Sequence, residues 1–489
     1  RDVNGLRAWA VVSVILFHFQ VAGFSGGFTG VDIFFVISGF LMTGIVTGKL
    51  ETGRFSTIDF YAARAKRIIP ALLVLCAVLL ACGWFFLQAP DYKQLASHAA
   101  YSLSFLSNRE YLQESGYFDS ASHEKWLLHT WSLSVEWQFY LILPIVLSVV
   151  WRFWPGRSKL AWAMGMAAAA SFIACVAVTK SAPASAFFLL VYRAWEMLAG
   201  GMVFLLAGRV TLSAHSRQVL SGSGLALIVA GIVLFDKHSA WPGVNAALPV
   251  LAASMVLLAN HDSFYTGNRL AQWLGDRSYS LYLWHWPVYV VLVFSEFHAY
   301  MAALAAGLCL TLIFGHLSYT LVEVRSRAWL GKSSPVKTAG AIGLALAIVA
   351  APALAVWRTQ GWPGRFPESV ENIALEATNS NVRRKDCHTL VGTTPRGCHY
   401  ELGSGSGSAI VLGDSHADAV VTASALNELD IKVEQMSYSG CAFVSGMKMS
   451  STFTERRSEE YQCDKFIKSL STELATRHTS TPIILVNRY

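Results

Sequence analysis

Residues 68–87 of the chain are IIPALLVLCAVLLACGWFFL, an uninterrupted apolar stretch without a charged side chain. A helix of about 20 such residues spans the hydrocarbon core of a bilayer. The composition of the whole chain points the same way, because 54% of its 489 residues are hydrophobic and only 14% are charged, whereas a soluble domain carries about 25% charged residues. Most of the chain is therefore expected to lie in a membrane.

Other apolar stretches flank this one, and lysine and arginine gather in alternate loops between them. Because positively charged loops stay in the cytoplasm, the alternation favours eleven crossings with the N-terminus inside. The residues after 358 then lie outside the cytoplasm. The loops also account for the net charge of +7, so no nucleic-acid partner is expected. The predicted spans are 6–23, 28–47, 68–87, 131–150, 160–178, 186–206, 220–235, 246–259, 279–294, 301–322 and 339–357, and the basic loops are 48–67, 151–159, 207–219, 260–278 and 323–338.

The first predicted span carries Arg7 and His18. Eleven residues are three helical turns plus about 20°, so both side chains lie on one face, with His18 roughly 16 Å deeper than Arg7. Ionisable groups inside membrane helices are costly and usually functional. The alternative is a snorkelling arginine and a hydrogen-bonded structural histidine.

Two further spans carry acidic residues near their outer ends. Asp32 begins the second span near the expected depth of His18, where it could act in the site or simply stabilise a helix N-terminus. In the fourth span His129, Ser132 and Glu136 share one helical face. This spacing predicts a carboxylate close to an imidazole at the outer end, where it would raise the basicity that a general base needs.

Arg64 and Arg67 lie one helical turn apart at the cytoplasmic end of the third span. Such a pair can hold phosphate groups. Ordinary positively charged loop residues are the alternative, and spacing alone favours it. The other polar side chains inside predicted spans are Arg193 and Glu196, and Ser278, Tyr282 and His285, of which the last three share a face.

The chain changes character after residue 358. Residues 361–408 are rich in glycine, proline, serine and charge, which is typical of a linker. Strand-like runs at 409–412 and 482–487, with helical periodicity over 417–429, predict an α/β domain with a parallel sheet. Its even number of cysteines predicts disulfides outside the cytoplasm. The pairs Cys387–Cys398 and Cys441–Cys463 are favoured over the two other pairings, and a metal site is not expected because CxxC spacing is absent.

Ser415 follows the first of these strands in the sequence IVLGDSHA (410–417). A serine at a strand-to-helix turn is exposed and lies near backbone donors, which suits a nucleophile. The same Asp-Ser pair is also an ordinary helix cap.

Residues 1–335 resemble the acyltransferase-3 family of integral membrane enzymes, many of which acetylate bacterial surface polysaccharides. The family's motifs occur here in the family's order. Two positions depart from the pattern: Ala63 stands where an arginine often precedes Arg64, and Arg325 replaces the proline of a closing Glu-x-Pro-x-Arg block. The matching motifs are Arg7-x10-His18, Gly30 to Gly39, Arg64-x-x-Arg67-Ile-x-Pro70, HTWSLSVE (129–136) and SYSLYLWH (278–285).

This resemblance implies acyl transfer across a bacterial inner membrane. The donor would be acetyl-coenzyme A from the cytoplasm, and its phosphates would lie near Arg7, Arg64 and Arg67. His18 would form the acyl-transfer centre, with Asp32 and Glu136 as further catalytic residues. The acceptor would be a surface polysaccharide or a lipid-linked glycan, such as lipopolysaccharide O-antigen, and no metal is implied.

The soluble part resembles SGNH hydrolases, a domain that often follows acyltransferase-3 units. By this resemblance Ser415 is the nucleophile, Gly440 is the glycine of the oxyanion hole and Asn487 is the asparagine of the third block. The family's Asp-x-x-His is expected beyond residue 489, so we expect an incomplete domain, and His416 is not expected to replace that histidine.

The predicted fold is an all-α polytopic membrane bundle of about eleven transmembrane helices, followed by a periplasmic α/β SGNH-hydrolase-like domain. Two other functions remain as alternatives: a transporter or flippase of a lipid-linked sugar, and a glycan-binding membrane protein with a degenerate SGNH module. Only the enzyme should discharge labelled acetyl-coenzyme A. The predicted divisions are the membrane domain at 1–335, an additional transmembrane helix at 336–358, a periplasmic linker at 359–408 and the SGNH-like domain at 409–489.

Overall fold

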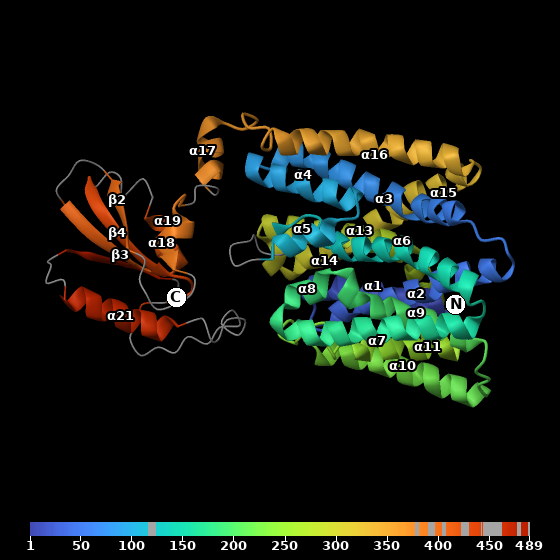
Figure 1. The fold of residues 1–489 in the computed structure, drawn as a ribbon. Helices are drawn as coiled ribbons and strands as arrows, with labels where there is room; N and C mark the ends of the chain where they lie inside the picture. The colour runs from blue at the N-terminus through green and yellow to red at the C-terminus, as the bar shows by residue number, and fades with distance from the viewer. Residues whose placement is uncertain are drawn as a thin grey trace. The chain divides into compact units, whose positions relative to one another are not determined.

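The chain forms two compact units, Arg1–Phe366 and Pro367–Tyr489. Helices make up the first unit, and the second contains a β-sheet (Figure 1). The structure is a computed structural model, and it describes residues 1–115, 124–376, 381–389, 397–402, 407–421, 430–441, 443, 462–476 and 481–487.

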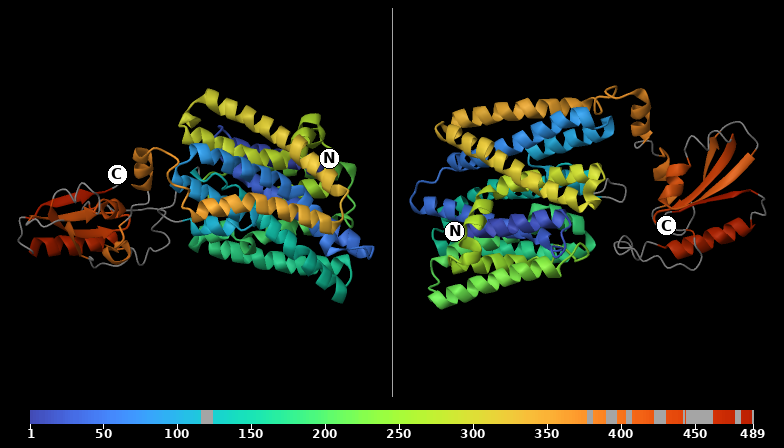
Figure 2. Two further views of the ribbon diagram at one scale, coloured as in Figure 1. Left: turned by 90° about the horizontal axis from the view of Figure 1, so that it is seen from above. Right: turned by 180° about the vertical axis from the view of Figure 1, so that it is seen from behind.

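The first unit is a bundle of long helices that run side by side (Figure 2). Each of the eleven predicted spans overlaps at least one helix, and among the described residues eight helices are long and apolar enough to cross a membrane. The prediction of a multi-pass membrane protein is therefore confirmed, while the count of eleven crossings stays a prediction. The helices are α1 (Asp2–His18), α2 (Gly30–Glu51), α3 (Thr57–Phe86), α4 (Ala89–Leu103), α5 (Ser107–Gln113), α6 (Thr130–Phe153), α7 (Arg157–Ser181), α8 (Pro183–Phe188), α9 (Leu190–Ala207), α10 (Ala214–Leu234), α11 (Ala247–Ala259), α12 (Phe264–Gly267), α13 (Arg269–Phe294), α14 (Met301–Leu317), a π-helix (Ser318–Glu323), α15 (Val324–Gly331) and α16 (Pro335–Arg358), with short 3-10 turns at Gly27–Thr29 and Phe297–Ala299.

Glycines allow α2 and α9 to pack backbone against backbone. A Cβ added to Gly39 would lie 1.7 Å from the carbonyl oxygen of Met197, and one added to Gly200 would lie 1.9 Å from that of Val36. No larger residue fits either position without moving a helix. Small residues commonly permit such contact between membrane helices. The contact brings the polar residues of α2 and α9 together, and α1 packs along α13 in the same bundle.

Helix α16 covers the predicted additional span and belongs to the first unit. It packs against α3 and α4, beside which it lies in Figure 1. Just beyond it, the Arg365 guanidinium donates a hydrogen bond to the carbonyl oxygen of Leu87 (2.8 Å) and lies over the ring of Tyr92 (4.5 Å). A cation near carbonyls at a helix C-terminus stabilises that end of the helix, so Arg365 joins the end of α16 to the end of α3.

The second unit contains a mixed sheet in the order β1-β4-β3-β5, with β2 also paired to β4. Strands β1, β3 and β5 run parallel to their neighbours and β2 runs antiparallel. The predicted parallel sheet is therefore present. The elements are α17 (Glu368–Glu376), α18 (Arg384–Cys387), β1 (His388–Thr389), β2 (Cys398–Leu402), β3 (Gly407–Gly413), α19 (Ser415–Val420), β4 (Ile431–Tyr438), α21 (Cys463–Thr476) and β5 (Ile483–Val486).

Two predictions about this unit fare differently. Both favoured disulfides, Cys387–Cys398 and Cys441–Cys463, are formed. The boundary at 409 stays a prediction, and β1, β2 and the start of β3 lie within 359–408, the segment interpreted as a linker. Its short strands carry too few apolar residues to stand out in sequence, and they pair because β4 supplies an edge. Most of the predicted helix at 417–429 lies outside the described residues.

Candidate functional site

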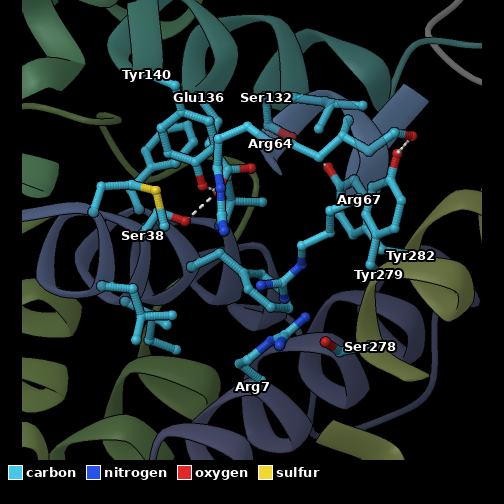
Figure 3. A pocket seen from close by; sticks show the side chains of 18 residues that line it. Arg7, Ser38, Arg64, Arg67, Ser132, Glu136, Tyr140, Ser278, Tyr279 and Tyr282 are labelled. Carbon is cyan, nitrogen blue, oxygen red and sulfur yellow. Dashed lines mark hydrogen bonds between the residues drawn. The ribbon is translucent and has the colours of Figure 1, made fainter. Parts of the chain in front are cut away.

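A cavity inside the first unit gathers the three arginines that the sequence assigned to the donor. Arg7 from α1 and Arg64 and Arg67 from α3 line about 810 Å³ of empty space, together with Glu136 from α6. Figure 3 shows these side chains turned toward the same space. Three cations and one carboxylate leave a net charge of +2, and the buried Nε of Arg64 has no hydrogen-bond partner among the described residues. Both features suit an anionic ligand.

Glu136 does not lie where the sequence interpretation placed it. Its carboxylate accepts hydrogen bonds from the hydroxyls of Ser38 and Tyr140 on the wall of the arginine cavity (Figure 3). His129, its expected partner, lines a different cavity. The two residues are seven positions apart, which corresponds to about 10 Å along a helix, so a shared face did not mean a shared depth. Here Glu136 belongs with the arginines.

A second cavity is lined by His18 at the end of α1, Asp32 near the start of α2 and His129 at the start of α6. The sequence interpretation placed His18 and Asp32 at similar depth, and the structure places both on this wall. Arg7 lies in the other cavity, so the first helix reaches from one cavity to the other.

The His18 ring is oriented by His285 of α13. Its Nδ1 lies 2.9 Å from Nε2 of His285, and Nδ1 of His285 lies 2.6 Å from the carbonyl oxygen of Tyr282. A carbonyl only accepts, so Nδ1 of His285 carries its proton, and Nε2 of the neutral ring accepts from Nδ1 of His18. The remaining nitrogen of His18, Nε2, then holds a lone pair, which a general base or a nucleophile requires.

Asp32 is paired with Arg193, an arginine that the sequence analysis noted without assigning a role. Nη2 of Arg193 donates to Oδ1 of Asp32 at 3.0 Å, and Nε lies 3.2 Å from Oε1 of Glu196. All three residues are buried. Because an isolated buried charge is very costly, the two carboxylates hold the guanidinium in place. Asp32 is thus arranged to position Arg193, which also lines the second cavity.

Tyr282 and Val31 line both cavities and so form the partition between them. The Tyr282 hydroxyl lies 2.7 Å from Oγ of Ser132 and donates to the carbonyl oxygen of His129 at 2.9 Å. Two contacts to α6 fix the ring at this position. Ser278 of α13 lines the arginine cavity, and His285 contacts His18 in the other cavity. The face of α13 that carries both residues therefore extends from one cavity to the other.

In the second unit the three residues assigned from the sequence follow the ends of three neighbouring parallel strands. Ser415 comes after β3, Gly440 after β4 and Asn487 directly after β5. The register aligns Gly413 with Ser437 on one side and with Val486 on the other. The carboxyl ends of parallel strands are where α/β folds place their ligand sites. Oδ1 of Asn487 also accepts from the backbone N–H of Phe443, at 3.4 Å.

The turn before Ser415 requires glycine. A Cβ on Gly413 would lie 1.8 Å from the carbonyl oxygen of Val486. Asp414 caps α19, because its Oδ1 accepts from the backbone N–H of His416 at 2.8 Å, and the ring nitrogen of His416 lies 3.0 Å from the same oxygen. The interpretation of Asp414 as a helix cap is therefore correct, and the ring of His416 contacts the same carboxylate.

His388, which the sequence analysis did not single out, lies buried on β1 one strand away from β3. Its Nδ1 is 2.8 Å from the Ser437 hydroxyl. Burial lowers the pKa of the His388 imidazole to about 4, against the smaller opposing effects of Asp418 and Asp414. The ring is therefore neutral at physiological pH. Nothing in its sequence context, Asp-Cys-His-Thr, distinguishes it from a surface histidine.

Membrane helices that enclose both an anion-attracting cavity and an oriented imidazole place this protein among membrane-embedded acyl-transfer enzymes. The chain belongs to the acyltransferase-3 family: the family's acyltransferase domain matches residues 1–320, and an SGNH domain of the kind fused to such domains matches residues 386–489. It is an O-acyltransferase.

Its relatives include BcsY of Komagataeibacter xylinus, a proposed membrane-bound transacylase that is 33% identical over 66% of this chain and 82% of its own length. The O-acetyltransferase OatA of Staphylococcus aureus is 38% identical over 31% of this chain and 26% of its own length. YrhL of Bacillus subtilis, a proposed peptidoglycan O-acetyltransferase, is 29% identical over 59% and 48%. The chain thus matches less than half the length of the last two. No solved structure matches this chain.

Proposed function

We propose that the protein moves an acetyl group from cytoplasmic acetyl-coenzyme A to a hydroxyl of an extracytoplasmic glycan, such as lipopolysaccharide O-antigen or peptidoglycan, at the bacterial inner membrane. The observation that carries the proposal is the pair of adjacent cavities, one lined by arginines and one by His18, on either side of Tyr282. The N-terminus lies in the cytoplasm and the SGNH unit in the periplasm.

Coenzyme A suits the arginine cavity because its phosphates are anionic and its thioester stands at the end of a long arm. Arg7, Arg64 and Arg67 bind the phosphates, and the orphaned Nε of Arg64 gains a partner. Glu136, which accepts hydrogen bonds from Ser38 and Tyr140, offsets part of the positive charge. The arm extends past Tyr282 toward His18.

His18 then handles the proton of the transfer. The acceptor hydroxyl oxygen attacks the thioester carbonyl carbon, a C–O bond forms and the C–S bond breaks. Nε2 of His18 takes the hydroxyl proton and passes it to the departing sulfur, which leaves as the thiol. The His285 contact keeps Nε2 unprotonated before each turnover. By this direct route the SGNH unit, with Ser415, Gly440 and Asn487, positions the glycan; the alternative is a relay in which Ser415 receives the acetyl group before the glycan does.

A reconstituted assay tests this function. Full-length protein in lipid nanodiscs receives acetyl-coenzyme A labelled in the acetyl group and envelope glycan stripped of its esters. We expect label to appear on the glycan in an alkali-labile ester and to be lost in His18→Ala. Normal labelling by that variant would exclude His18 from the transfer, and no labelling by the unsubstituted protein would contradict the proposal.

The proposed orientation has its own test. Ser408 lies at the start of β3 in the second unit, and a cysteine placed there should react with a membrane-impermeant maleimide in intact spheroplasts. A cysteine at Ser333, in the loop before α16, is the matched control and should react only after the membrane is opened. The opposite labelling pattern would invert the topology.

A further inference from the structure

The cavity around His18 has walls that the acetyl group alone does not need. Besides polar residues, the wall of this cavity carries aromatic rings from five separate parts of the first unit. Phe28 and Trp241 stack edge to face with ring centroids 4.8 Å apart, and Trp286 packs edge-on against His18 at 4.7 Å. An acetyl group has only two carbons, so it cannot contact all of these aromatic side chains at once. The aromatic residues of the wall are Phe28, Trp131, Phe187, Phe188, Trp241 and Trp286.

A buried guanidinium on this wall keeps donors without a hydrogen-bond partner. Nη1 of Arg193 has no such partner among the described residues, although the side chain is only 1% exposed; Nη2 donates to Asp32, and Nε lies 3.2 Å from Oε1 of Glu196 without making a hydrogen bond. A buried guanidinium nitrogen without a partner costs free energy. The guanidinium also lies against the rings of Trp131 and Phe187, each 5.8 Å away. A ligand oxygen in the cavity would satisfy Nη1.

We propose that the cavity around His18 is the binding site for a sugar ring of the acceptor glycan. This inference rests on the proposed function and places the acceptor inside the membrane unit. A pyranose ring presents an apolar C–H face and a rim of hydroxyls, which matches aromatic faces combined with charged hydrogen-bonding groups. The aromatic wall receives the C–H face, Arg193 donates to a ring hydroxyl, and the hydroxyl to be acetylated faces Nε2 of His18.

The composition of the wall favours a sugar over a lipid chain as the ligand of this cavity. An acyl or prenyl chain would gain nothing from Arg193, Asp32, His18 and His129, whose burial is costly without a polar ligand. A free anion would satisfy Arg193, but Asp32 and Glu196 already give it two carboxylates. A neutral, hydroxyl-rich ligand meets both the polar and the aromatic parts of the wall.

The test separates acceptor binding from donor binding. Full-length protein in lipid nanodiscs is assayed with labelled acetyl-coenzyme A and de-esterified envelope glycan from the source bacterium, each titrated in turn. Trp241→Leu should raise the KM for glycan by about tenfold, the loss expected for one buried aromatic contact, and leave the KM for acetyl-coenzyme A within about twofold. Trp241→Phe should restore most of the glycan affinity, and Arg193→Lys, which loses the forked donor, should raise the same KM.

Trp162→Leu is the matched control, because Trp162 lies on α7 and is 73% exposed, away from this cavity; it should change neither KM. If Trp241→Leu does not fold, Phe28→Leu alters the same wall. A folded variant with an unchanged glycan KM, or with both KM values raised together, overturns the inference and leaves the proposed function standing. An unsubstituted protein that transfers no label to the glycan overturns both.

Discussion

The two units of this protein assemble their candidate sites in opposite ways. In the membrane unit, His18 meets His285 and Asp32 meets Arg193, pairs separated by 267 and 161 residues along the chain. In the SGNH unit, each assigned residue simply follows the end of a strand, and the strands lie next to one another. A parallel sheet brings its strand ends to one edge, whereas a helix bundle must match the depth of every residue separately.

This difference has a consequence for how each site tolerates change. In the membrane unit the polar residues are satisfied by one another, so removing one leaves a charge or a donor buried without a partner. In the SGNH unit the positions are fixed by backbone pairing and by the two disulfides. Substitutions of these paired polar residues should therefore cost stability as well as chemistry in the membrane unit, whereas the assigned side chains of the SGNH unit should be replaceable with less loss of stability.

The largest expected effect is that of His18→Ala, which should lower glycan acetylation at least about a hundredfold, the usual contribution of a general base. Ser415→Ala is the comparison in the other unit. If Ser415 relays the acetyl group, its loss should abolish glycan esters while coenzyme A thiol is still released in a first turnover. Retained glycan esters would mean that the SGNH unit positions the acceptor. Thiol release, followed with a chromogenic disulfide, and ester content are measured on the same samples.

The next largest effect is expected from removing the disulfide between Cys441 and Cys463. The bond closes a loop of 22 residues, and replacing both cysteines with serine should reduce the stability of the SGNH unit by about 3 kcal/mol. Hydrogen exchange of peptides from β4 and α21 should accelerate, while coenzyme A binding to the membrane unit stays unchanged. Weakened coenzyme A binding in this variant would show that the two units do not behave independently.

Arg64→Ala and Arg67→Ala should each weaken coenzyme A binding by about one to two orders of magnitude, because a hydrogen bond to a charged group contributes roughly 1.5–3 kcal/mol. Isothermal titration of the protein in nanodiscs measures the Kd. Lys66→Ala is the matched control, since Lys66 lies between them on α3 but does not line the cavity. An equal loss of coenzyme A affinity in Lys66→Ala would mean that the effect comes from the positive charge of this region in general and not from contacts in the cavity.

The last effect, similar in size to that of the arginine variants, concerns His388 and the dependence of stability on pH. Its pKa is about 4 in the folded unit and about 6.5 when unfolded, so the folded unit binds fewer protons. The stability that this residue contributes is full above pH 6.5 and is lost as the pH falls toward 4, by about 2–3 kcal/mol. Hydrogen exchange of β1 and β4 peptides at pH 7 and pH 5 measures the change, and His388→Gln should flatten it. An unchanged slope in His388→Gln would assign the pH dependence to another group.

The sequence by itself determined the broad organisation of this protein. Uncharged stretches such as 68–87 are incompatible with water, so the membrane unit and its helices could be predicted from composition and length alone. The even number of cysteines in the soluble part predicted disulfides, and the favoured one of the three possible pairings is formed. The turn at Gly413–Ser415 was visible because strand, glycine and helix are local features.

Only the tertiary structure decided which side chains share a cavity. Periodicity assigns a residue to a face of its helix, but it says nothing of which helix packs there or at what depth. For this reason Glu136 was expected beside an imidazole and lies with the arginines, and Arg193 and His285 were noticed without a role. The glycines at 39 and 200 and the packing of α1 along α13 bring these groups together, and these contacts depend on residues too far apart in the sequence for any local pattern to record them.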